Sequence, residues 1–485
     1  MISSQLGSGA TKTVQDVYEG VDVWGRGSHG GGGFGSYRAI EHIDPVSLGL
    51  SVALFAPGWT WETNQDSAGF SWSSWWEIER RLWIGPRENV VVPPMPQPRE
   101  GDPDPHGPFR PFSDFFASQL PPDPATLPFC TTFSPGVGFA WFVNGTAVMP
   151  RTASGWTDID KQSALGDKLW PRPQVQWEDR EGTKEPIPDA SSTLYFDDAW
   201  LGGNGLRVTF NAIGSQAEDA VFRSVWLPIQ SLNVTPNVRY TARVVFKALH
   251  AATEQFPVDT DVGLTVKYPG STLEVIDIPK AEELTGGWTR QTMTFMLSAQ
   301  NQDLKDAPIT AGLVVGFTTE DPSKAVQFSI LLGQLSVYPA SPTPTLNLSP
   351  ASPRILWADF QPSKDHNSGI LTWELGSAYP PITLPVAAPP VDSPIPLWSF
   401  DNSKHAFPSC AYFNIYAGTS LGGPAKATFI GTTGLDGRAN RFYVDWGVLP
   451  DAIKGLKEIR FFVQGVTDRG EVMEWEKCVF VDASR

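Results

Sequence analysis

The stretch that decides the fold of the N-terminal region is DVYEGVDVWGRGSHGGGGFGSYRAIEHI, residues 16–43. Its first nine residues, Asp16–Trp24, are rich in β-branched and aromatic side chains and predict a strand. A run of glycines follows. Apolar residues then recur at three-residue spacing between Tyr37 and Ile43, which predicts a short amphipathic helix with Ser36 as its N-cap. The region therefore begins as a strand, a glycine-rich loop and a helix.

A second strand and helix follow the first pair. The nearly all-apolar segment Leu50–Ala56 is typical of a strand that is buried on both faces in a parallel sheet. Residues 69–85 predict a helix in which five bulky side chains share one face, namely Trp72, Trp75, Trp76, Leu82 and Trp83. We expect its charged residues to form a solvated face, namely Glu77, Glu79, Arg80 and Arg81.

This order predicts one quarter of a (β/α)8 barrel. Two parallel strands and two helices cannot close a sheet or cover its edges. We therefore expect residues 1–95 to be the remnant of the last strands and helices of such a barrel. Either another chain supplies the neighbouring strands, or this polypeptide is the tail of something longer.

The rest of the chain predicts β-structure, so the fold class is α/β plus β. A Pro-rich connector over residues 90–111 excludes a helix or a central strand there. Short apolar runs then alternate with turns, and the Asn144-Gly145 pair is a strong hairpin signal. We expect a jelly-roll-like β-sandwich over residues 109–340. After a second Pro-rich linker, we expect a fibronectin type III or immunoglobulin-like sandwich over residues 353–485.

Composition narrows the class of ligand. The net charge of −16 disfavours nucleic acid and anionic membranes as partners. The 19 tryptophans favour large cores or stacking on flat ligands. The three cysteines lie far apart and the six histidines are scattered, so the sequence predicts neither a disulfide framework, a metal site nor a bound cofactor. No signal peptide or long apolar span is apparent, and we expect a cytosolic protein.

The glycine run admits two interpretations. Residues 25–30 match the pattern GxGxxG after a strand, with Asp44 near the position of a ribose-binding acid in dinucleotide sites. Three more glycines in a row follow this pattern before the helix, which disfavours the nucleotide interpretation. The alternative is a loop at the carboxyl end of a barrel strand, where barrel enzymes place their active sites.

Two adjacent strand ends carry side chains suited to a neutral carbohydrate. Asp22 and Trp24 point to one side of the first strand, Arg26 follows at the rim, and more aromatic and acidic residues follow the second strand. The predicted substrate-binding residues are Asp22, Trp24, Arg26, Gly30, Gly31, Gly32, Gly33, Phe34, Trp59, Trp61 and Glu62. The alternative is that Asp22 forms a buried ion pair with Arg26 and that the tryptophans only pack in the core.

Several strings resemble glycoside hydrolase family 85, the cytosolic endo-β-N-acetylglucosaminidases. They are VYEGVDVWGRGSHGGGGFGSYRAI, SVALFAPGWTWE, RLWIG, LPFCTTFSPGVGFAWFVNG, WTDIDKQSALG and DDAWLGGNGLRV, which occur in the family's order within about the first 210 residues. The resemblance implies hydrolysis of the β-1,4 bond between the two core N-acetylglucosamines of an N-glycan, with retention of configuration. It also implies that the substrate's 2-acetamido oxygen is the nucleophile. An Asn would orient that group, and a Glu two residues later would be the general acid/base.

The sequence departs from the family at this catalytic pair. No Asn in the 485 residues has a Glu two positions later, although Asn64-Gln65-Asp66 has an Asp at that place. The resemblance therefore implies pocket-lining residues but no catalytic ones, and we expect the isolated chain to be inactive towards N-glycans and glycoproteins. The alternative is a non-catalytic carbohydrate-binding protein built on the β-sandwiches, in which the Gly-rich stretch Asp197–Val208 with Trp200 binds sugar, although a β-turn is the simpler interpretation of that stretch.

Overall fold

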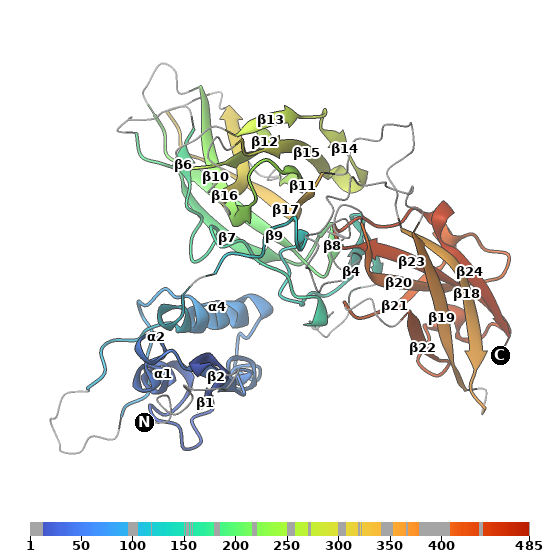
Figure 1. Ribbon diagram of the computed structural model, residues 1–485, viewed down its shortest axis with the longest axis horizontal. Helices are drawn as coiled ribbons and strands as arrows, with labels where there is room; N and C mark the ends of the chain where they lie inside the picture. The colour runs from blue at the N-terminus through green and yellow to red at the C-terminus, as the bar shows by residue number, and fades with distance from the viewer. Residues whose placement is uncertain are drawn as a thin grey trace, which may run out of the picture. The chain divides into compact units, whose positions relative to one another are not determined.

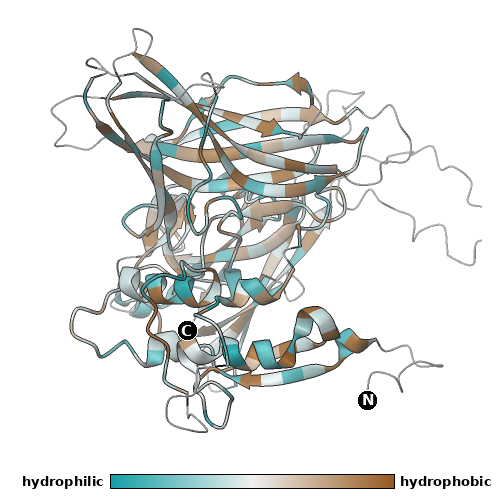
Figure 2. Cartoon of the chain, turned by 90° about the vertical axis from the view of Figure 1, so that its left-hand side faces the viewer, coloured by the Kyte–Doolittle hydropathy of each residue, from teal (hydrophilic) through white to brown (hydrophobic). Residues whose placement is uncertain are grey.

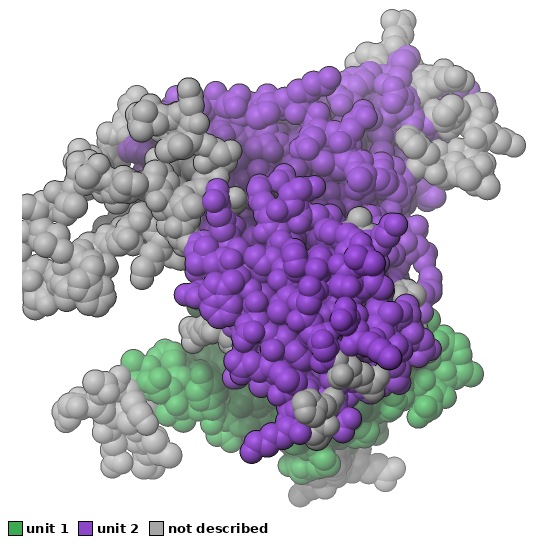
Figure 3. Space-filling model, turned by 90° about the vertical axis from the view of Figure 1, so that its right-hand side faces the viewer, with its two compact units in different colours: residues 1–119 green, residues 120–485 purple. Residues whose placement is uncertain are grey.

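The chain forms two compact units, residues 1–119 and residues 120–485 (Figure 3). The computed structural model describes residues 13–95, 105–117, 119–149, 151, 155, 157, 159–178, 185–215, 221–249, 258–269, 273–298, 307–318, 321, 323–340, 353–364, 367–377, 408–435 and 440–484. Strands predominate and helices are few (Figure 1). None of the helices in these ranges has the length and hydropathy needed to cross a membrane.

The first unit contains the expected order of strand, helix, strand and helix. Its elements are η1 (Val14–Asp16), β1 (Tyr18–Asp22), η2 (Gly33–Gly35), α1 (Tyr37–Ile43), α2 (Pro45–Leu48), β2 (Ser51–Phe55), α3 (Trp59–Glu62), α4 (Trp72–Trp83) and η3 (Phe112–Phe115). Strands β1 and β2 pair in parallel, from Tyr18 opposite Ser51 to Asp22 opposite Phe55. Ser71 caps α4 by accepting a hydrogen bond from the Ser74 amide, which fixes where this helix begins.

The core of the first unit lies on one side of this strand pair. Val21 and Val23 are buried with Tyr37 and Ile40 of α1, Leu82 of α4 and three phenylalanines at and just after the end of the connector, Phe109, Phe112 and Phe115. The expectation that the second strand is buried on both faces is wrong, because Ala53 is exposed and Phe55 is 63% exposed. In the described ranges the sheet has two strands, and Ala53 and Phe55 lie on its solvent-exposed face.

The described residues of the second unit form 22 strands, and every strand pair among them is antiparallel. Up to residue 340 its elements are β3 (Phe129–Thr131), β4 (Trp141–Val143), β5 (Thr146–Met149), η4 (Ile159–Lys161), β6 (Gln176–Trp177), β7 (Asp189–Tyr195), β8 (Leu201–Gly202), β9 (Gly205–Ala212), β10 (Phe222–Val234), β11 (Arg239–Leu249), β12 (Asp259–Lys267), β13 (Glu274–Asp277), β14 (Glu282–Glu283), η5 (Thr285–Gly287), β15 (Thr289–Met296), β16 (Ala307–Thr318) and β17 (Val326–Pro339). The predicted hairpin is confirmed, because β4 and β5 pair across Asn144 and Gly145, which have φ values of 50° and 72°.

Most strands before residue 340 form two large sheets, and β5, β4 and β8 form a separate three-stranded sheet. One sheet has the order β12-β16-β10-β6, and the other contains the path β13-β15-β11-β17-β9-β7. Hydrophobic and hydrophilic residues alternate along many of these strands (Figure 2), as along β9, whose inward residues Leu206, Val208 and Phe210 are buried. This alternation places one face of each strand in a core.

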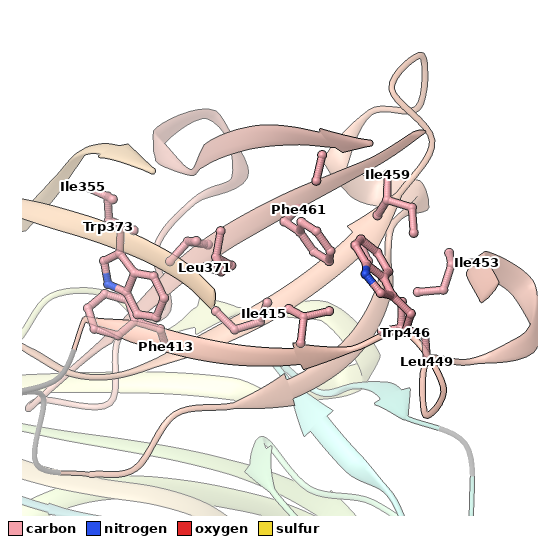
Figure 4. Packing of buried hydrophobic residues seen from close by; sticks show 14 residues of the cluster. Ile355, Leu371, Trp373, Phe413, Ile415, Trp446, Leu449, Ile453, Ile459 and Phe461 are labelled. Atoms are coloured by element: carbon pink, nitrogen blue, oxygen red, sulfur yellow. The ribbon is translucent and has the colours of Figure 1, made fainter. Parts of the chain in front are cut away.

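The strands after residue 352 form two smaller sheets. Their elements are β18 (Pro353–Pro362), β19 (Ser368–Ser377), β20 (Cys410–Gly418), η8 (Pro424–Lys426), β21 (Thr428–Thr432), β22 (Arg441–Asp445), α5 (Asp451–Lys454), β23 (Glu458–Thr467), η9 (Trp475–Lys477) and β24 (Val479–Ser484). The sheets have the orders β18-β19-β22 and β21-β20-β23-β24. Between them, Trp373 packs on Phe413, and Trp446 lies beside Ile453 and Phe461 (Figure 4).

A further core joins the two parts of the second unit. Trp141, Trp200 and Trp288 come from before residue 340, and they pack with Tyr416 and Phe429 from after residue 352. The rings of Trp141 and Phe429 stack at 6.4 Å with an interplanar angle of 15°. The two β-regions therefore share buried apolar surface and form one compact unit.

Candidate ligand site

The two parallel strands of the first unit end at the same edge of their sheet. Asp22 and Phe55 are register partners at the carboxyl ends of β1 and β2. The loop over residues 23–36 leaves β1, and residues 56–62 with α3 follow β2. These two connections carry every residue of the predicted site beyond Asp22 itself.

Asp22 and Arg26 form an ion pair at this edge. Arg26 Nε donates to Asp22 Oδ2 at 2.8 Å, and Arg26 Nη2 to Oδ1 at 3.3 Å. This bidentate contact lowers the pKa of Asp22 and raises that of Arg26. The Arg26 side chain is 63% exposed, and its guanidinium lies 5.4 Å from the centre of the Phe55 ring. The ion pair that we considered as the alternative is therefore present, but it is open to solvent rather than buried.

Trp24 and Glu62 connect the loops that follow the two strands. The indole Nε1 of Trp24 donates to Glu62 Oε2 at 2.8 Å, and the Trp24 amide donates to Asp22 Oδ1 at 3.0 Å. Trp24 is 37% exposed, and Glu62 is exposed as well. The edge thus presents an indole, a carboxylate and a guanidinium to solvent, all held by hydrogen bonds.

The glycines of this loop are required mainly because the loop packs closely on itself and on Trp59. Gly30, Gly32 and Gly33 are buried, and only Gly31 of the Gly30–Gly33 run is exposed. A Cβ on Gly33, whose φ is 51°, would lie 2.4 Å from the Trp59 ring, and one on Gly32 would lie 2.4 Å from the Gly25 nitrogen. The loop is therefore a tightly folded structure that only glycine permits.

The GxGxxG pattern does not open a helix. Helix α1 begins at Tyr37, and a short 3₁₀ turn, η2, precedes it. A pyrophosphate site in a dinucleotide fold needs the glycine turn to lead directly into the helix N-terminus. The geometry therefore does not support the nucleotide interpretation.

The remaining aromatic residues of the predicted site pack against the protein. Phe34 contacts the edges of Trp59 and Phe109, with ring centres 5.5 and 5.4 Å apart. Trp61 packs on Trp72 of α4 with ring centres 4.5 Å apart. The predicted set thus divides into solvent-facing residues and residues that support them.

Glu79 of α4 is not on a solvated face, which corrects that expectation. Thr60 Oγ1 donates to Glu79 Oε2 at 2.5 Å, and Trp83 Nε1 donates to Oε1 at 2.8 Å. Burial raises the pKa of the Glu79 carboxyl above its usual range. The spacing of Glu79 and Trp83, four residues apart, was the one signal available in the sequence. Through its hydrogen bond with Thr60, Glu79 links α4 to α3, the short helix that also contains Trp59 and Trp61.

Three histidines that looked scattered in the sequence meet in this unit. His29 Nε2 lies 2.8 Å from His106 Nε2, although 77 residues separate them, and the His29 and His42 rings lie 5.0 Å apart. Glu41 accepts from His106 Nδ1 at 2.6 Å. No group of three or more His, Cys, Asp or Glu residues in the described ranges has the arrangement of a metal site.

The stretch Asp197–Val208 in the second unit is not an open sugar-binding loop. Trp200 is 3% exposed and packs on Trp288 with ring centres 6.1 Å apart. Asn204 is fully buried and donates to the Phe133 carbonyl at 3.0 Å. Residues 203 and 204 form the short connection between β8 and β9, which belong to different sheets.

Comparison with known proteins places these features in a family. Residues 2–141 match the family model of glycosyl hydrolase family 85. This segment is similar to glycosyl hydrolase family 85. The family 85 segment contains the strand pair, the glycine loop and the solvent-facing residues of the candidate site.

Relatives agree with this assignment. The cytosolic endo-beta-N-acetylglucosaminidase of Gallus gallus is 25% identical over 217 residues, which are 44% of this chain and 22% of that protein. The Homo sapiens protein of the same name is 44% identical over 69 residues, or 14% of this chain and 9% of that protein. The chain thus spans less than a quarter of the length of these relatives. The glycoside hydrolase domain of Endo-D from Streptococcus pneumoniae aligns with 98% of this chain and 58% of its own, at 14% identity and a TM-score of 0.49.

Proposed function

We propose that the family 85 segment forms one wall of an N-glycan site of an endo-β-N-acetylglucosaminidase. The observation that supports this most is the hydrogen bond from Trp24 Nε1 to Glu62 Oε2, 2.8 Å long, which joins the ends of two parallel strands. Barrel enzymes build their sites from such strand ends. In this proposal, residues 1–95 are a barrel remnant, and residues 109–340 and 353–485 are accessory β-sandwiches.

The exposed groups match the chemistry of a neutral sugar. The Trp24 ring offers an apolar face to a pyranose ring. Glu62 accepts hydrogen bonds from sugar hydroxyls, and Arg26 donates to hydroxyl or acetamido oxygens. Asp22 orients Arg26 through two hydrogen bonds, so the guanidinium is preorganised for the ligand.

We further propose that this polypeptide binds the glycan without cleaving it. Substrate-assisted hydrolysis in this family needs the Asn-x-Glu pair, and the 485 residues contain none. Two relatives are named as cytosolic enzymes, which supports a cytosolic location for this protein.

The test is glycan binding by the full chain. Isothermal titration with a released N-glycan that ends in N,N′-diacetylchitobiose should give a measurable affinity. Trp24→Ala should weaken it at least tenfold, because the aromatic platform and the Glu62 partner are lost together. Trp83→Ala is the matched control, since Trp83 is 38% exposed against 37% for Trp24 and also donates to a glutamate.

The outcomes separate the proposal from its alternative. Binding that survives Trp24→Ala would assign the glycan to the β-sandwiches of the second unit and overturn the proposed site. Release of N-glycans from a denatured glycoprotein by the purified chain would contradict the proposed lack of cleavage while leaving the binding site intact.

A further inference from the structure

The second unit contains a cavity that the proposed glycan site does not use. Its volume is about 360 Å³, and residues of β11, β15 and the connection between β23 and β24 line it. The charged and amide side chains of its lining are Arg243, Arg290, Glu471, Glu474, Lys477 and Asn144. A cavity of this size with a few polar groups is typical of a small-molecule site.

The sheet register places two arginines together in this lining. Arg243 of β11 pairs with Thr292 of β15, and Val245 pairs with Arg290. Because side chains alternate between the two faces of a sheet, Arg243 and Arg290 lie on the same face as diagonal neighbours. Side chains of this length at diagonal positions are close enough to contact one ligand together.

Each of these guanidiniums uses a small part of its hydrogen-bonding capacity. Arg243 Nη1 donates to Glu471, and Arg290 Nη1 donates to Glu282 Oε2 at 3.1 Å. Within the described residues, these are the only hydrogen bonds of the two guanidiniums, whereas a guanidinium has five N–H groups. Planar donors of this kind bind the oxygens of carboxylates and phosphates, which accept without donating.

The partner carboxylates do not cancel the positive charge inside the cavity. The Arg243 and Arg290 side chains are 18% and 27% exposed. Their partners Glu471 and Glu282 are 40% and 59% exposed. Water therefore screens the two carboxylates more strongly than the two guanidiniums, and the inner part of the cavity favours an anion.

A third arginine adds positive charge next to Arg243. Arg469 is buried, and its guanidinium lies 4.3 Å from the centre of the Tyr338 ring, which the Arg243 guanidinium approaches to 5.8 Å. Burial lowers the pKa of Arg469, and the charge of Arg243 acts in the same direction. Asp468 and Glu471 oppose this shift without reversing it. An anion beside Arg243 would offset the repulsion between the two arginines.

The rest of the lining suits the hydroxyl groups of a sugar. Glu474 accepts hydrogen bonds, Lys477 donates them, and the Asn144 amide does both. Lys477 Nζ lies 2.9 Å from Glu474 Oε2, so these two groups already form a pair at the rim. The lining also includes apolar surface, from Pro353, Val472 and Met473.

The turn that carries Glu471 is held by hydrogen bonds of its own. The Thr467 amide donates to the Glu471 carbonyl at 2.8 Å, and the Glu471 amide donates to Thr467 Oγ1 at 3.1 Å. Glu471 in turn accepts from Arg243. The position of Arg243 is therefore set before a ligand binds, which lowers the entropic cost of binding.

We propose that this cavity binds a small acidic sugar, whose carboxylate or phosphate group contacts Arg243 and Arg290 and whose hydroxyl groups contact Glu474 and Asn144. The site lies outside residues 2–141 and shares no residue with the proposed glycan site, so each can be tested without the other. Since residues from before residue 340 and from after residue 352 line the cavity, the ligand would also stabilise the contact between these two β-regions.

The experiment is isothermal titration of the full chain with three probes that share one ring, namely glucuronate, glucose 6-phosphate and glucose. At low ionic strength at least one acidic probe should bind about tenfold or more tightly than glucose, because only the acidic probes carry an oxyanion. The tighter of the two identifies the bound group as carboxylate or phosphate. Inorganic phosphate should bind more weakly than glucose 6-phosphate, since it lacks the ring.

Substitution of Arg290 should weaken binding of the tighter acidic probe. Arg290→Gln should reduce the affinity about fivefold or more, and Arg290→Lys should reduce it less, because it keeps the charge without the planar donors. The matched control is Arg460→Gln, which should leave the affinity unchanged. Arg460 is 21% exposed, pairs with the exposed Asp482 and lies over an aromatic ring as Arg290 does, but it does not line the cavity.

A second readout and a second variant keep the proposal testable if an Arg290 variant does not fold. The tighter acidic probe should raise the melting temperature of the wild type and of Arg460→Gln by similar amounts, and that of Arg290→Gln by less. Lys477 is 50% exposed, so Lys477→Gln should fold normally and reduce the affinity about twofold.

Several results would overturn the proposal. Equal affinity for glucose and the acidic probes would indicate a site for a neutral sugar. Inorganic phosphate that binds as tightly as glucose 6-phosphate would indicate an inorganic anion as the occupant. Absence of binding by both acidic probes would refute the site, as would unchanged affinity in folded Arg290→Gln or, where that variant does not fold, in Lys477→Gln.

Discussion

The two units bury their strands in opposite ways. In the first unit, β1 and β2 pair with each other, and Phe55 and Tyr18 are exposed on the strands. In the second unit, sheets of up to eight strands pack against one another and share a core of tryptophans. Strand pairs gain stability chiefly from neighbours and a covered face. The comparison teaches that the residues of the proposed glycan site lie on the less covered unit, whereas the better covered unit buries a cluster of tryptophans and other aromatic residues in its shared core.

A substitution that disrupts the shared core should have the largest effect on stability. Trp288 is fully buried between the two parts of the second unit, so Trp288→Ala should lower its free energy of unfolding by about 3–5 kcal/mol. Urea denaturation of the full chain measures this. Trp357, which is exposed on β18, is the control, and Trp357→Ala should change the value by less than about 1 kcal/mol.

The difference in coverage predicts a difference in local stability. Limited proteolysis of the full chain, followed by mass spectrometry, should cleave within residues 1–119 well before it cleaves the strands of the second unit. A first cut inside β10, β11 or β17 would contradict the comparison, because these strands carry the buried centre of their sheets.

Glycine substitutions sharpen the description of the loop. Gly27 and Gly33 both have positive φ, but a Cβ on Gly27 meets nothing within 4 Å, whereas one on Gly33 overlaps the Trp59 ring. Gly27→Ala should cost about 1 kcal/mol from the backbone conformation alone. Gly33→Ala should cost at least about 1 kcal/mol more, from overpacking against Trp59. Equal thermal shifts for the two variants would argue against the folded loop.

Substitution of Glu79 should have the smallest effect on stability, and this effect should depend on pH. Its folded-state pKa is raised by burial, so the unfolded chain loses this proton first as pH increases. The contribution of Glu79 to the stability of the first unit is therefore greatest below its unfolded pKa and falls as pH rises through the folded pKa. The difference in melting temperature between wild type and Glu79→Gln should consequently favour the wild type more at pH 4 than at pH 7. An unchanged difference would contradict the buried position.

Local patterns predicted the elements, and long-range packing decided their environment. The Asn144-Gly145 hairpin and helix α4 follow from turn chemistry and helical spacing, which act within a few residues. Such local patterns do not say whether Trp61 faces a ligand or packs on α4. The structure shows that the Trp61 ring packs on Trp72 of α4.

The histidine contact and the burial of Glu79 depend on residues that the fold brings together. His29 and His106 are 77 residues apart, and Thr60 and Glu79 are 19 apart. No short-range pattern specifies such pairs, because they arise from tertiary packing. The pairing of Asp22 with Arg26, four residues apart, was considered from the sequence and is present.

The most direct test of the proposed site uses the indole N–H signals of the chain in two-dimensional NMR, with Trp24 and Trp83 assigned by Trp→Phe variants. On addition of the chitobiose-terminated N-glycan, the Trp24 signal should shift and broaden, because its Nε1–H bond to Glu62 lies in the proposed contact. The Trp83 signal, from an equally exposed indole, should stay in place. A Trp24 signal that does not move while signals from the second unit do would contradict the account.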